Sequence, residues 1–168
     1  MQFFTISSEP KLIRNFQCDV LDWTDVIDNL NYTIDNHLFF KKFENYGFVT
    51  HNGYTIPKCR TILNLIYKNN LDHPKEAFTA HIYTSFTTLS ATFDEHIDAT
   101  TDVWFWQCIG ITKWEFTFNS NKIEELLFPG DILFIPKGIP HKTTPMTPRS
   151  GVSFGLEHDK KEYNIENF

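Results

Sequence analysis

The chain has 168 residues, which suits one domain that can bury about two-thirds of the surface of its unfolded form. Aromatic residues make up 16% of the sequence, and side chains of this kind favour strands and pocket walls. The net charge of −6 argues against a nucleic-acid partner, and no apolar stretch approaches the roughly 20 residues of a membrane-spanning helix.

The three cysteines, Cys18, Cys59 and Cys108, are odd in number and form no CxxC pair, so neither a zinc knuckle nor a disulfide framework is indicated. Residues 1–14 lack the basic segment and long apolar stretch of a signal peptide. We therefore expect reduced thiols in a cytoplasmic protein, either a monomer or a homodimer, with no membrane partner.

Residues 1–77 have a mixed, partly helical pattern. Asp22 or Thr24 can cap a first helix, and Trp23 is placed to pack at its entry. The spacing of apolar residues along this helix predicts one buried face, formed by Val26, Ile27, Leu30 and Ile34.

A second helix is expected at about residues 56–70, before the stop signals at Asn69-Asn70 and His73-Pro74. Thr55 can cap it, and Pro57 suits its first turn. The predicted buried stripe of this helix consists of Cys59, Leu63 and Ile66.

From Phe78 onward the pattern changes to short stretches rich in β-formers, separated by turn signals. The expected strands are 80–86, 90–96, 103–108, 113–118, 132–135 and 151–156. Many short strands without helices between them are typical of a sandwich or barrel. We therefore predict a β-dominated α+β domain in which the N-terminal helices pack outside a barrel at 78–157, followed by a charged tail at 158–168.

The segment around His96 contains a pair of candidate metal ligands. Alternate residues of a strand share a face, so His96 and Asp98 are expected to project together, with Ile97 on the other face. One imidazole and one carboxylate aimed into a barrel offer two adjacent ligands to a divalent metal ion. The H-x-D triplet alone is weak evidence, because it occurs by chance in many proteins.

Residues 130–141, GDILFIPKGIPH, read as a strand between two tight turns that is followed by a histidine. Gly138 is free to adopt a positive φ in the second turn, and His141 then enters the next strand near the barrel mouth. Because the H-x-D triplet lies about 40 residues upstream in the same β-rich region, we predict that His141 is the third ligand.

These two segments resemble motifs of a known superfamily. Residues 130–141 resemble the second cupin motif, a glycine followed by Pro-x-Gly and a histidine. Residues 96–114, HIDATTDVWFWQCIGITKW, resemble the iron-binding region of the JmjC family of 2-oxoglutarate oxygenases. The resemblance covers about residues 80–157 and implies a double-stranded β-helix, the jelly-roll or cupin-like barrel. Ordinary metal cupins differ, because they carry a second histidine where this chain has Asp98.

The resemblance implies a function as well as a fold. His96, Asp98 and His141 would hold Fe(II), and 2-oxoglutarate would be the co-substrate in the hydroxylation of a protein or peptide side chain or of a small molecule. Two alternatives remain open. One is a metal cupin of another reaction class, and the other is a non-catalytic binding or structural module built on the same barrel.

Two cations are candidate anchors for the distal carboxylate of 2-oxoglutarate. JmjC relatives usually place a Lys or Arg two residues after the glycine of the turn, where this chain has Thr112. Lys113 would face outward unless a bulge after Gly110 turned it inward. Arg149 is the other candidate, since an arginine can bind a carboxylate with two hydrogen bonds. Hydroxyl donors to the co-substrate can come from Tyr83, Thr88 and Thr92.

The remaining aromatic and histidine residues have less specific interpretations. Trp104 and Trp106 share a strand face, and they belong either to the core or to the wall of the metal pocket. His51 and His81 have no evident companion ligand, and His158 is expected in a solvated tail.

Overall fold

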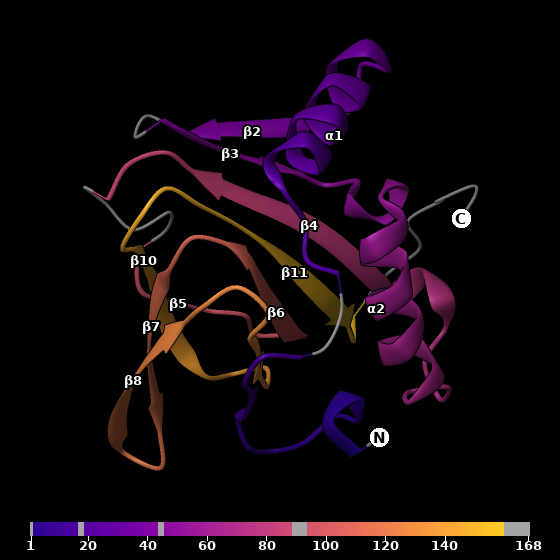
Figure 1. The fold of residues 1–168 in the computed structure, drawn as a ribbon. Coiled ribbons are helices and arrows are strands. Elements are labelled where there is room, and N and C mark those ends of the chain that lie inside the picture. Colours follow the sequence, from indigo (N-terminus) through magenta and orange to yellow (C-terminus); the bar gives the residue numbers. More distant parts are fainter. Residues whose placement is uncertain (1, 17–18, 44–45, 89–93, 160–168) are drawn as a thin grey trace.

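The structure is a computed structural model, and it describes residues 2–16, 19–43, 46–88 and 94–159. Within these residues the strands form two antiparallel sheets (Figure 1). The larger sheet has the order β1 (Lys11–Ile13), β9 (Ile132–Ile135), β6 (Thr101–Ile109), β11 (Arg149–Glu157), β4 (Phe78–Ser85), β3 (Gly47–Thr50) and β2 (Phe40–Phe43). The smaller sheet has the order β5 (His96–Ile97), β10 (Pro140–Pro145), β7 (Thr112–Phe118) and β8 (Asn121–Leu127).

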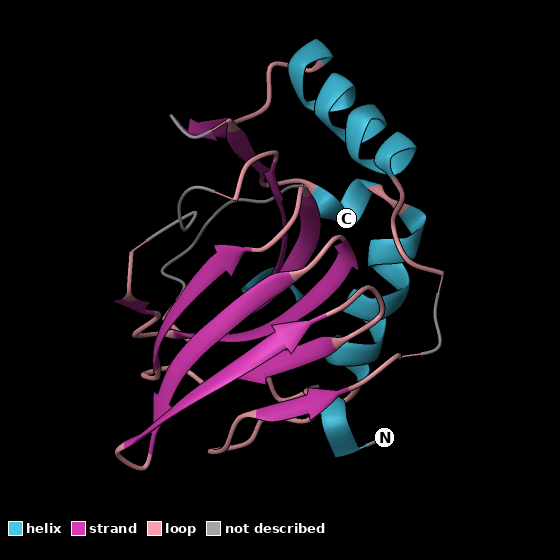
Figure 2. Ribbon diagram, turned by 60° about the vertical axis from the view of Figure 1, so that its left-hand side comes forward, coloured by secondary structure: helices cyan, strands magenta, loops and turns pink. Residues whose placement is uncertain are grey.

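The order of the strands is that of a jelly roll, because many neighbours in space are distant in the sequence. β6 lies between β9 and β11, and β10 lies between β5 and β7. The helices lie outside the strands (Figure 2, cyan). The β-dominated α+β class predicted from the sequence, with its N-terminal helices outside the barrel, is therefore confirmed. None of the helices that the structure describes has both the length and the hydropathy that a membrane crossing requires.

Two apolar cores lie on the two faces of the larger sheet. The core between the sheets contains side chains from both of them, namely Val103, Phe105, Trp114, Phe116, Leu127, Leu133 and Ile135. Because side chains alternate along a strand, the residues of β6 between these point to the opposite face. The candidate site described below lies beside this inner core.

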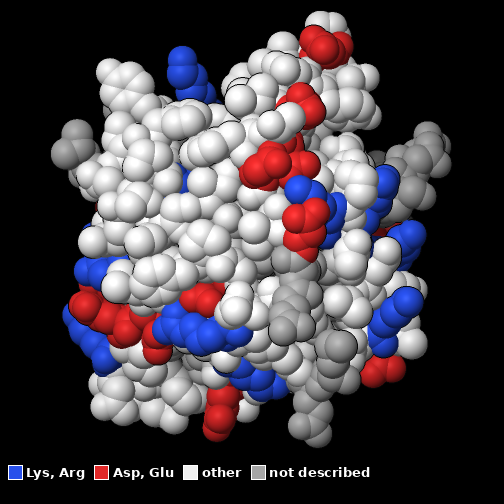
Figure 3. Space-filling model, viewed as in Figure 1, with Lys and Arg blue, Asp and Glu red and all other residues white. Residues whose placement is uncertain are grey.

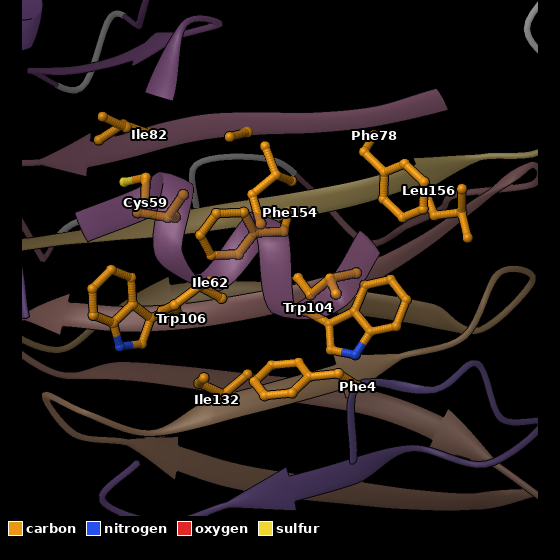
Figure 4. Packing of buried hydrophobic residues seen from close by; sticks show 14 of the residues in the cluster. Phe4, Cys59, Ile62, Phe78, Ile82, Trp104, Trp106, Ile132, Phe154 and Leu156 are labelled. Atoms are coloured by element: carbon orange, nitrogen blue, oxygen red, sulfur yellow. The ribbon is translucent and has the colours of Figure 1, made fainter. Parts of the chain in front are cut away.

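The second core fills the space between the outer face of the larger sheet and α2 (Pro57–Lys68) (Figure 4). Trp104 and Trp106 are fully buried there with Phe154 and Ile62. Of the two interpretations of these tryptophans, the structure supports the core. Neither residue lines the cavity of the candidate site.

The first long helix, α1 (Trp23–Asp35), begins as predicted, with Asp22 as its cap. The Asp22 carboxylate accepts hydrogen bonds from the backbone N–H groups of Thr24 and Asp25 at 2.8 and 3.0 Å. The backbone N–H of Asp22 in turn donates to the Asp25 carboxylate. Trp23 stacks on Phe86 at a centroid distance of 5.7 Å. The capping box therefore sets where α1 starts.

The predicted apolar face of α1 is correct for Val26 but wrong for Ile27 and Ile34. Ile27 and Ile34 are 54% and 49% exposed, and the buried side chains besides Val26 are polar. The amide oxygen of Asn29 accepts a hydrogen bond from the Thr50 hydroxyl at 2.6 Å, and the Thr33 hydroxyl donates to the Asn52 side chain. The amide nitrogen of Asn29 donates to the carbonyl oxygen of Asn52 and to the Thr55 hydroxyl. Hydrogen bonds to β3 and the following loop thus decide which face of α1 is buried.

The second helix, α2, starts at Pro57 and ends at Lys68. Pro57 occupies the first turn and Cys59, Leu63 and Ile66 are buried, as predicted. The cap prediction is wrong, because Thr55 belongs to the short 3-10 helix η2 (Gly53–Thr55) and Ile56 precedes the helix without a side-chain cap. Two further 3-10 turns are η1 (Gln2–Phe4) and η3 (Lys75–Ala77).

Most predicted strands lie within one or two residues of the observed ones. The expected strand 90–96 lies partly outside the described residues, and its described end forms only the two-residue β5. The sequence did not reveal β8 or the short strands β1, β2 and β3. Cys59 and Cys108 are buried, and neither forms a disulfide within the part of the chain that the structure describes, whereas Cys18 lies outside that part.

Candidate metal centre

Two histidines lie directly opposite each other on neighbouring strands of the smaller sheet. His96 begins β5, and the antiparallel register pairs it with His141 of β10. Their ring centroids are 4.4 Å apart. The turn before β10 has Gly138 at φ +82°, a conformation that glycine adopts without strain. This turn reverses the chain after β9 and sets His141 beside His96.

Asp98 directly follows β5 and lies on the same side as His96, while Ile97 between them is 54% exposed. Oδ2 of Asp98 is 3.6 Å from Nε2 of His141. One candidate ligand atom from each of the three side chains lies within 4.8 Å of the other two. The structure thus brings together the three residues that the sequence predicted to meet.

Backbone carbonyls set the tautomer of both imidazoles. Nδ1 of His96 lies 2.9 Å from the carbonyl oxygen of Asp94, and Nδ1 of His141 lies 3.0 Å from that of Ile139. A carbonyl can only accept, so Nδ1 carries the proton and donates in each ring. Nε2 then has the lone pair that a metal ion requires.

The surroundings of His141 favour its neutral form. Burial lowers the pKa of His141, and repulsion between protons on the adjacent rings of His141 and His96 lowers it as well, while the hydrogen bond to Ile139 and the carboxylate of Asp98 act in the opposite direction. The Trp114 ring stacks on the imidazole at a centroid distance of 5.5 Å. Since a neutral imidazole is the form that binds metal ions, this environment prepares His141 as a ligand.

A cavity of about 70 Å³ lies beside the three side chains. Besides the candidate ligands, its wall contains Tyr83, Val103, Phe105, Trp114, Thr143, Arg149 and Ser153. One water molecule needs about 10–15 Å³ by this measure, so the cavity has room for several water-sized groups. A wider hollow of about 390 Å³ shares Tyr83, His96 and Asp98 with the cavity, and Asp94 and Glu95 complete its wall.

Arg149 and Tyr83 give the cavity wall a cation and a hydroxyl donor. Arg149 is 1% exposed, and its guanidinium carbon lies 5.9 Å from the centre of the Phe105 ring. Burial lowers the pKa of Arg149 to about 10, so the group is charged at neutral pH. Burial raises the pKa of Tyr83 to about 12, and the charge on Asp98 contributes to the rise, so its phenol keeps the proton.

Lys113, the other candidate cation, is not at the cavity. Its ammonium forms an ion pair with Glu115 at 3.1 Å, on the face of β7 opposite to Trp114. β7 keeps a regular register with both neighbouring strands, so no bulge turns Lys113 inward. Thr88 is exposed and does not line the cavity, and Thr92 lies outside the described residues.

The other histidines are placed differently from the candidate ligands. The rings of His51 and His81 are 4.4 Å apart, but within the described part of the chain no third ligand joins them. The expectation that His158 is solvated is wrong. Its Nε2 lies 2.7 Å from Oδ2 of Asp102, and its side chain is only 18% exposed.

Several cavity residues were not singled out from the sequence, although strand alternation would have found some of them. Thr143 is two residues after His141 in β10, and Ser153 is four residues after Arg149 in β11, so each shares a face with a predicted site residue. Phe105 lies between the two tryptophans of β6 that were considered as wall residues.

The three candidate ligands fit a ferrous ion. Two neutral imidazoles and one carboxylate form a set that Fe(II) favours when it keeps one open face. Ligands about 2.1 Å from a common ion and at right angles to one another are about 3 Å apart. The observed separations of up to 4.8 Å are wider, so small side-chain movements would bring the three atoms onto one ion.

No protein-family model matches the sequence, and a search of curated proteins found no match. Among solved structures, the ribosomal oxygenase YcfD from Escherichia coli, in complex with cobalt and 2-oxoglutarate, superposes with a TM-score of 0.65 at 17% identity. The match covers 91% of this chain and 49% of YcfD. Another structure of the same protein gives a TM-score of 0.66 at 16% identity.

The jelly roll also matches proteins of a different kind. Procruciferin, an 11S globulin from Brassica napus, superposes with a TM-score of 0.51 at 13% identity over 71% of this chain and 27% of its own. The chain spans about half the length of the YcfD structures that it matches. At these identities the comparisons establish the fold alone, and this chain has a cupin-like jelly-roll fold similar to that of YcfD.

Proposed function

We propose that the chain is an Fe(II)- and 2-oxoglutarate-dependent oxygenase that hydroxylates a protein side chain or a small molecule. One observation carries the proposal. His96, Asp98 and His141 line the same small cavity as the buried guanidinium of Arg149. A metal site needs only the first three residues, whereas a metal site that also binds a dicarboxylate needs a cation at a distance from the metal.

Each of these residues has a specific role in the proposed enzyme. Nε2 of His96, Nε2 of His141 and a carboxylate oxygen of Asp98 would hold the iron. Bound iron supplies the site for 2-oxoglutarate and for the activation of dioxygen. In this proposal Arg149 binds the distal carboxylate of 2-oxoglutarate through two hydrogen bonds, and the protonated phenol of Tyr83, in the same cavity wall, donates a third.

The walls of the cavity separate the reacting groups from water. Val103, Phe105 and Trp114 are buried and present apolar surface to the cavity. The substrate would approach through the wider hollow that adjoins His96 and Asp98. Exclusion of water strengthens the interaction between Arg149 and a carboxylate, because charges attract more strongly in a medium of low dielectric constant.

The proposed substrate is a protein side chain or a small molecule. On the face drawn in Figure 3, lysines and arginines are scattered and form no single basic patch, and acidic side chains gather over α1. The expectation that no nucleic acid binds rests on the net charge of −6 and stays a prediction. The cytoplasmic location and the choice between monomer and homodimer stay predictions.

Two other functions use the same fold. A metal cupin of another reaction class requires the three metal ligands but no buried cation. A non-catalytic module requires no buried cation either. Arg149 favours the oxygenase over both, since a fully buried arginine beside a candidate metal site has a direct use in binding a dicarboxylate.

An anaerobic titration tests the proposal. The protein is loaded with Fe(II) and titrated with 2-oxoglutarate while visible absorption is recorded. We expect a weak charge-transfer band that saturates at one equivalent per chain, and succinate formation once air is admitted. Iron-loaded protein that gives neither the band nor succinate would contradict the proposal and favour one of the two alternatives.

A further inference from the structure

The loop between β5 and β6 carries Asp98, and hydrogen bonds from two other segments hold this loop in place. The N–H of Gly138 donates to the carbonyl oxygen of Asp98 at 2.9 Å. The N–H of His158 donates to the carbonyl oxygen of Thr100, also at 2.9 Å. The position of the Asp98 carboxylate therefore depends on the turn after β9 and on the end of β11.

The same turn also contacts the third candidate ligand. Ile139 directly follows Gly138, and its carbonyl oxygen accepts the hydrogen bond from Nδ1 of His141 at 3.0 Å. Residues 137–139 thus touch the backbone of Asp98 on one side and the imidazole of His141 on the other. A shift of this turn would move two of the three candidate ligands relative to each other.

Asp102 holds the turn from inside the protein. Its Oδ1 accepts a hydrogen bond from the N–H of Lys137 at 2.8 Å, and its Oδ2 lies 2.7 Å from Nε2 of His158. The residue is 1% exposed and does not line the cavity. One buried carboxylate therefore ties together the start of β6, the turn before β10 and the end of β11. The ring of His158 also packs edge-on against the ring of His73, and the two ring centroids are 5.1 Å apart.

We propose that Asp102 is a positioning residue for the metal centre, which sets the separation of Asp98 and His141 through the turn 137–139. The inference rests on the proposed metal site but not on the reaction performed there. Outer hydrogen-bond partners that orient ligands typically change metal affinity by about 10- to 100-fold when they are removed. Because Asp102 acts through a backbone turn and not on a ligand directly, we expect an effect near the lower end, about 10-fold.

The test measures Co(II) affinity of the full chain by calorimetry, so that no turnover is required. Asp102→Ala removes both acceptors and should weaken Co(II) binding about 10-fold. Asp102→Asn keeps one acceptor for the N–H of Lys137 and should restore the affinity to within about threefold of the wild type. If Asp102→Ala fails to fold, Asp102→Leu fills the same space without an acceptor and takes its place.

Asp131 offers a matched control. It is also a buried aspartate (3% exposed) that accepts backbone N–H groups at a turn, from Asn15 at 2.9 Å and Phe128 at 3.0 Å, but it lies outside the cavity wall. Asp131→Ala should lower the melting temperature and leave the Co(II) affinity of the folded protein unchanged. A general loss of stability would affect both variants alike, whereas a positioning role separates them.

The outcomes distinguish this inference from the proposed function. Equal Co(II) affinity in wild type and the alanine or leucine variant of Asp102 would overturn the positioning role and leave the metal site intact. Wild-type protein that binds no Co(II) would overturn both. Wild-type protein that binds Co(II) but not 2-oxoglutarate would refute the oxygenase alone, and the positioning role would stand on the difference between the Asp102 and Asp131 variants.

Discussion

At the scale of single residues, the candidate site depends on how burial controls charge. Arg149 is charged inside the protein, His141 is kept neutral and the Tyr83 phenol keeps its proton. These are the forms that bind a dicarboxylate and a metal ion. Burial favours the neutral forms of His141 and Tyr83, whereas Arg149 stays charged in spite of its burial.

The two candidate cations give a direct prediction. Arg149→Gln should weaken 2-oxoglutarate binding to the metal-loaded protein by about 2–3 kcal/mol, or roughly 30- to 150-fold, because it removes a charged hydrogen-bond partner from a buried site. Lys113→Gln is the matched control and should change the affinity less than about twofold, since Lys113 pairs with Glu115 outside the cavity. The dissociation constants come from titration under anaerobic conditions. The reverse order of effects would assign the anchor to Lys113.

The pKa of His141 predicts how stability depends on pH. Its folded-state pKa lies below the ordinary value of about 6.5, so the unfolded chain takes up this proton at a higher pH than the folded chain. The free energy of unfolding of the metal-free protein should therefore decrease as the pH falls below about 6.5. Urea denaturation at pH 7.5 and 5.5 measures the decrease, which should be smaller in His141→Gln. Equal decreases in the two proteins would show that His141 does not contribute to the pH dependence of stability.

At the scale of helices and strands, the sequence predicted whether a segment is a helix or a strand better than it predicted which side of that element is buried. The strands around the site were found because β-formers and turn residues alternate clearly from Phe78 onward. The face of α1 was misjudged because hydrogen bonds to Thr50, Asn52 and Thr55 bury its polar side, and these partners lie on other elements. The short strand β5 owes its position to pairing with β10, which no local pattern encodes.

Substitutions in α1 can test this reversal of faces. Asn29→Ala should lower the free energy of unfolding by about 1–3 kcal/mol, because it takes the Asn29 acceptor away from the buried Thr50 hydroxyl and removes the hydrogen bond to Thr55. Ile27→Ala, on the exposed side, should cost less than about 0.5 kcal/mol. Urea denaturation gives both values. A larger loss of unfolding free energy in Ile27→Ala than in Asn29→Ala would support the apolar face predicted from the sequence.

At the scale of the whole molecule, some residues of the candidate site could be predicted from sequence motifs, whereas others are recognised only once the fold is known. The three candidate ligands could be predicted because two motifs carry them at recognisable spacing, within the family resemblance. Arg149 could be chosen over Lys113 only when the register of β7 was known, and the link from Asp102 to the turn before His141 joins segments about 35 residues apart. The two apolar cores hold the fold without using any of the candidate ligands.

The central claim is that one metal ion is bound jointly by His96, Asp98 and His141. The most direct measurement is the stoichiometry and affinity of Co(II) binding to the wild-type protein and to His141→Ala, with His81→Ala as a histidine control outside the site. The account predicts one tightly bound ion per chain in the wild type and in His81→Ala, and loss of that ion in His141→Ala. Stoichiometric binding that survives in His141→Ala would contradict it.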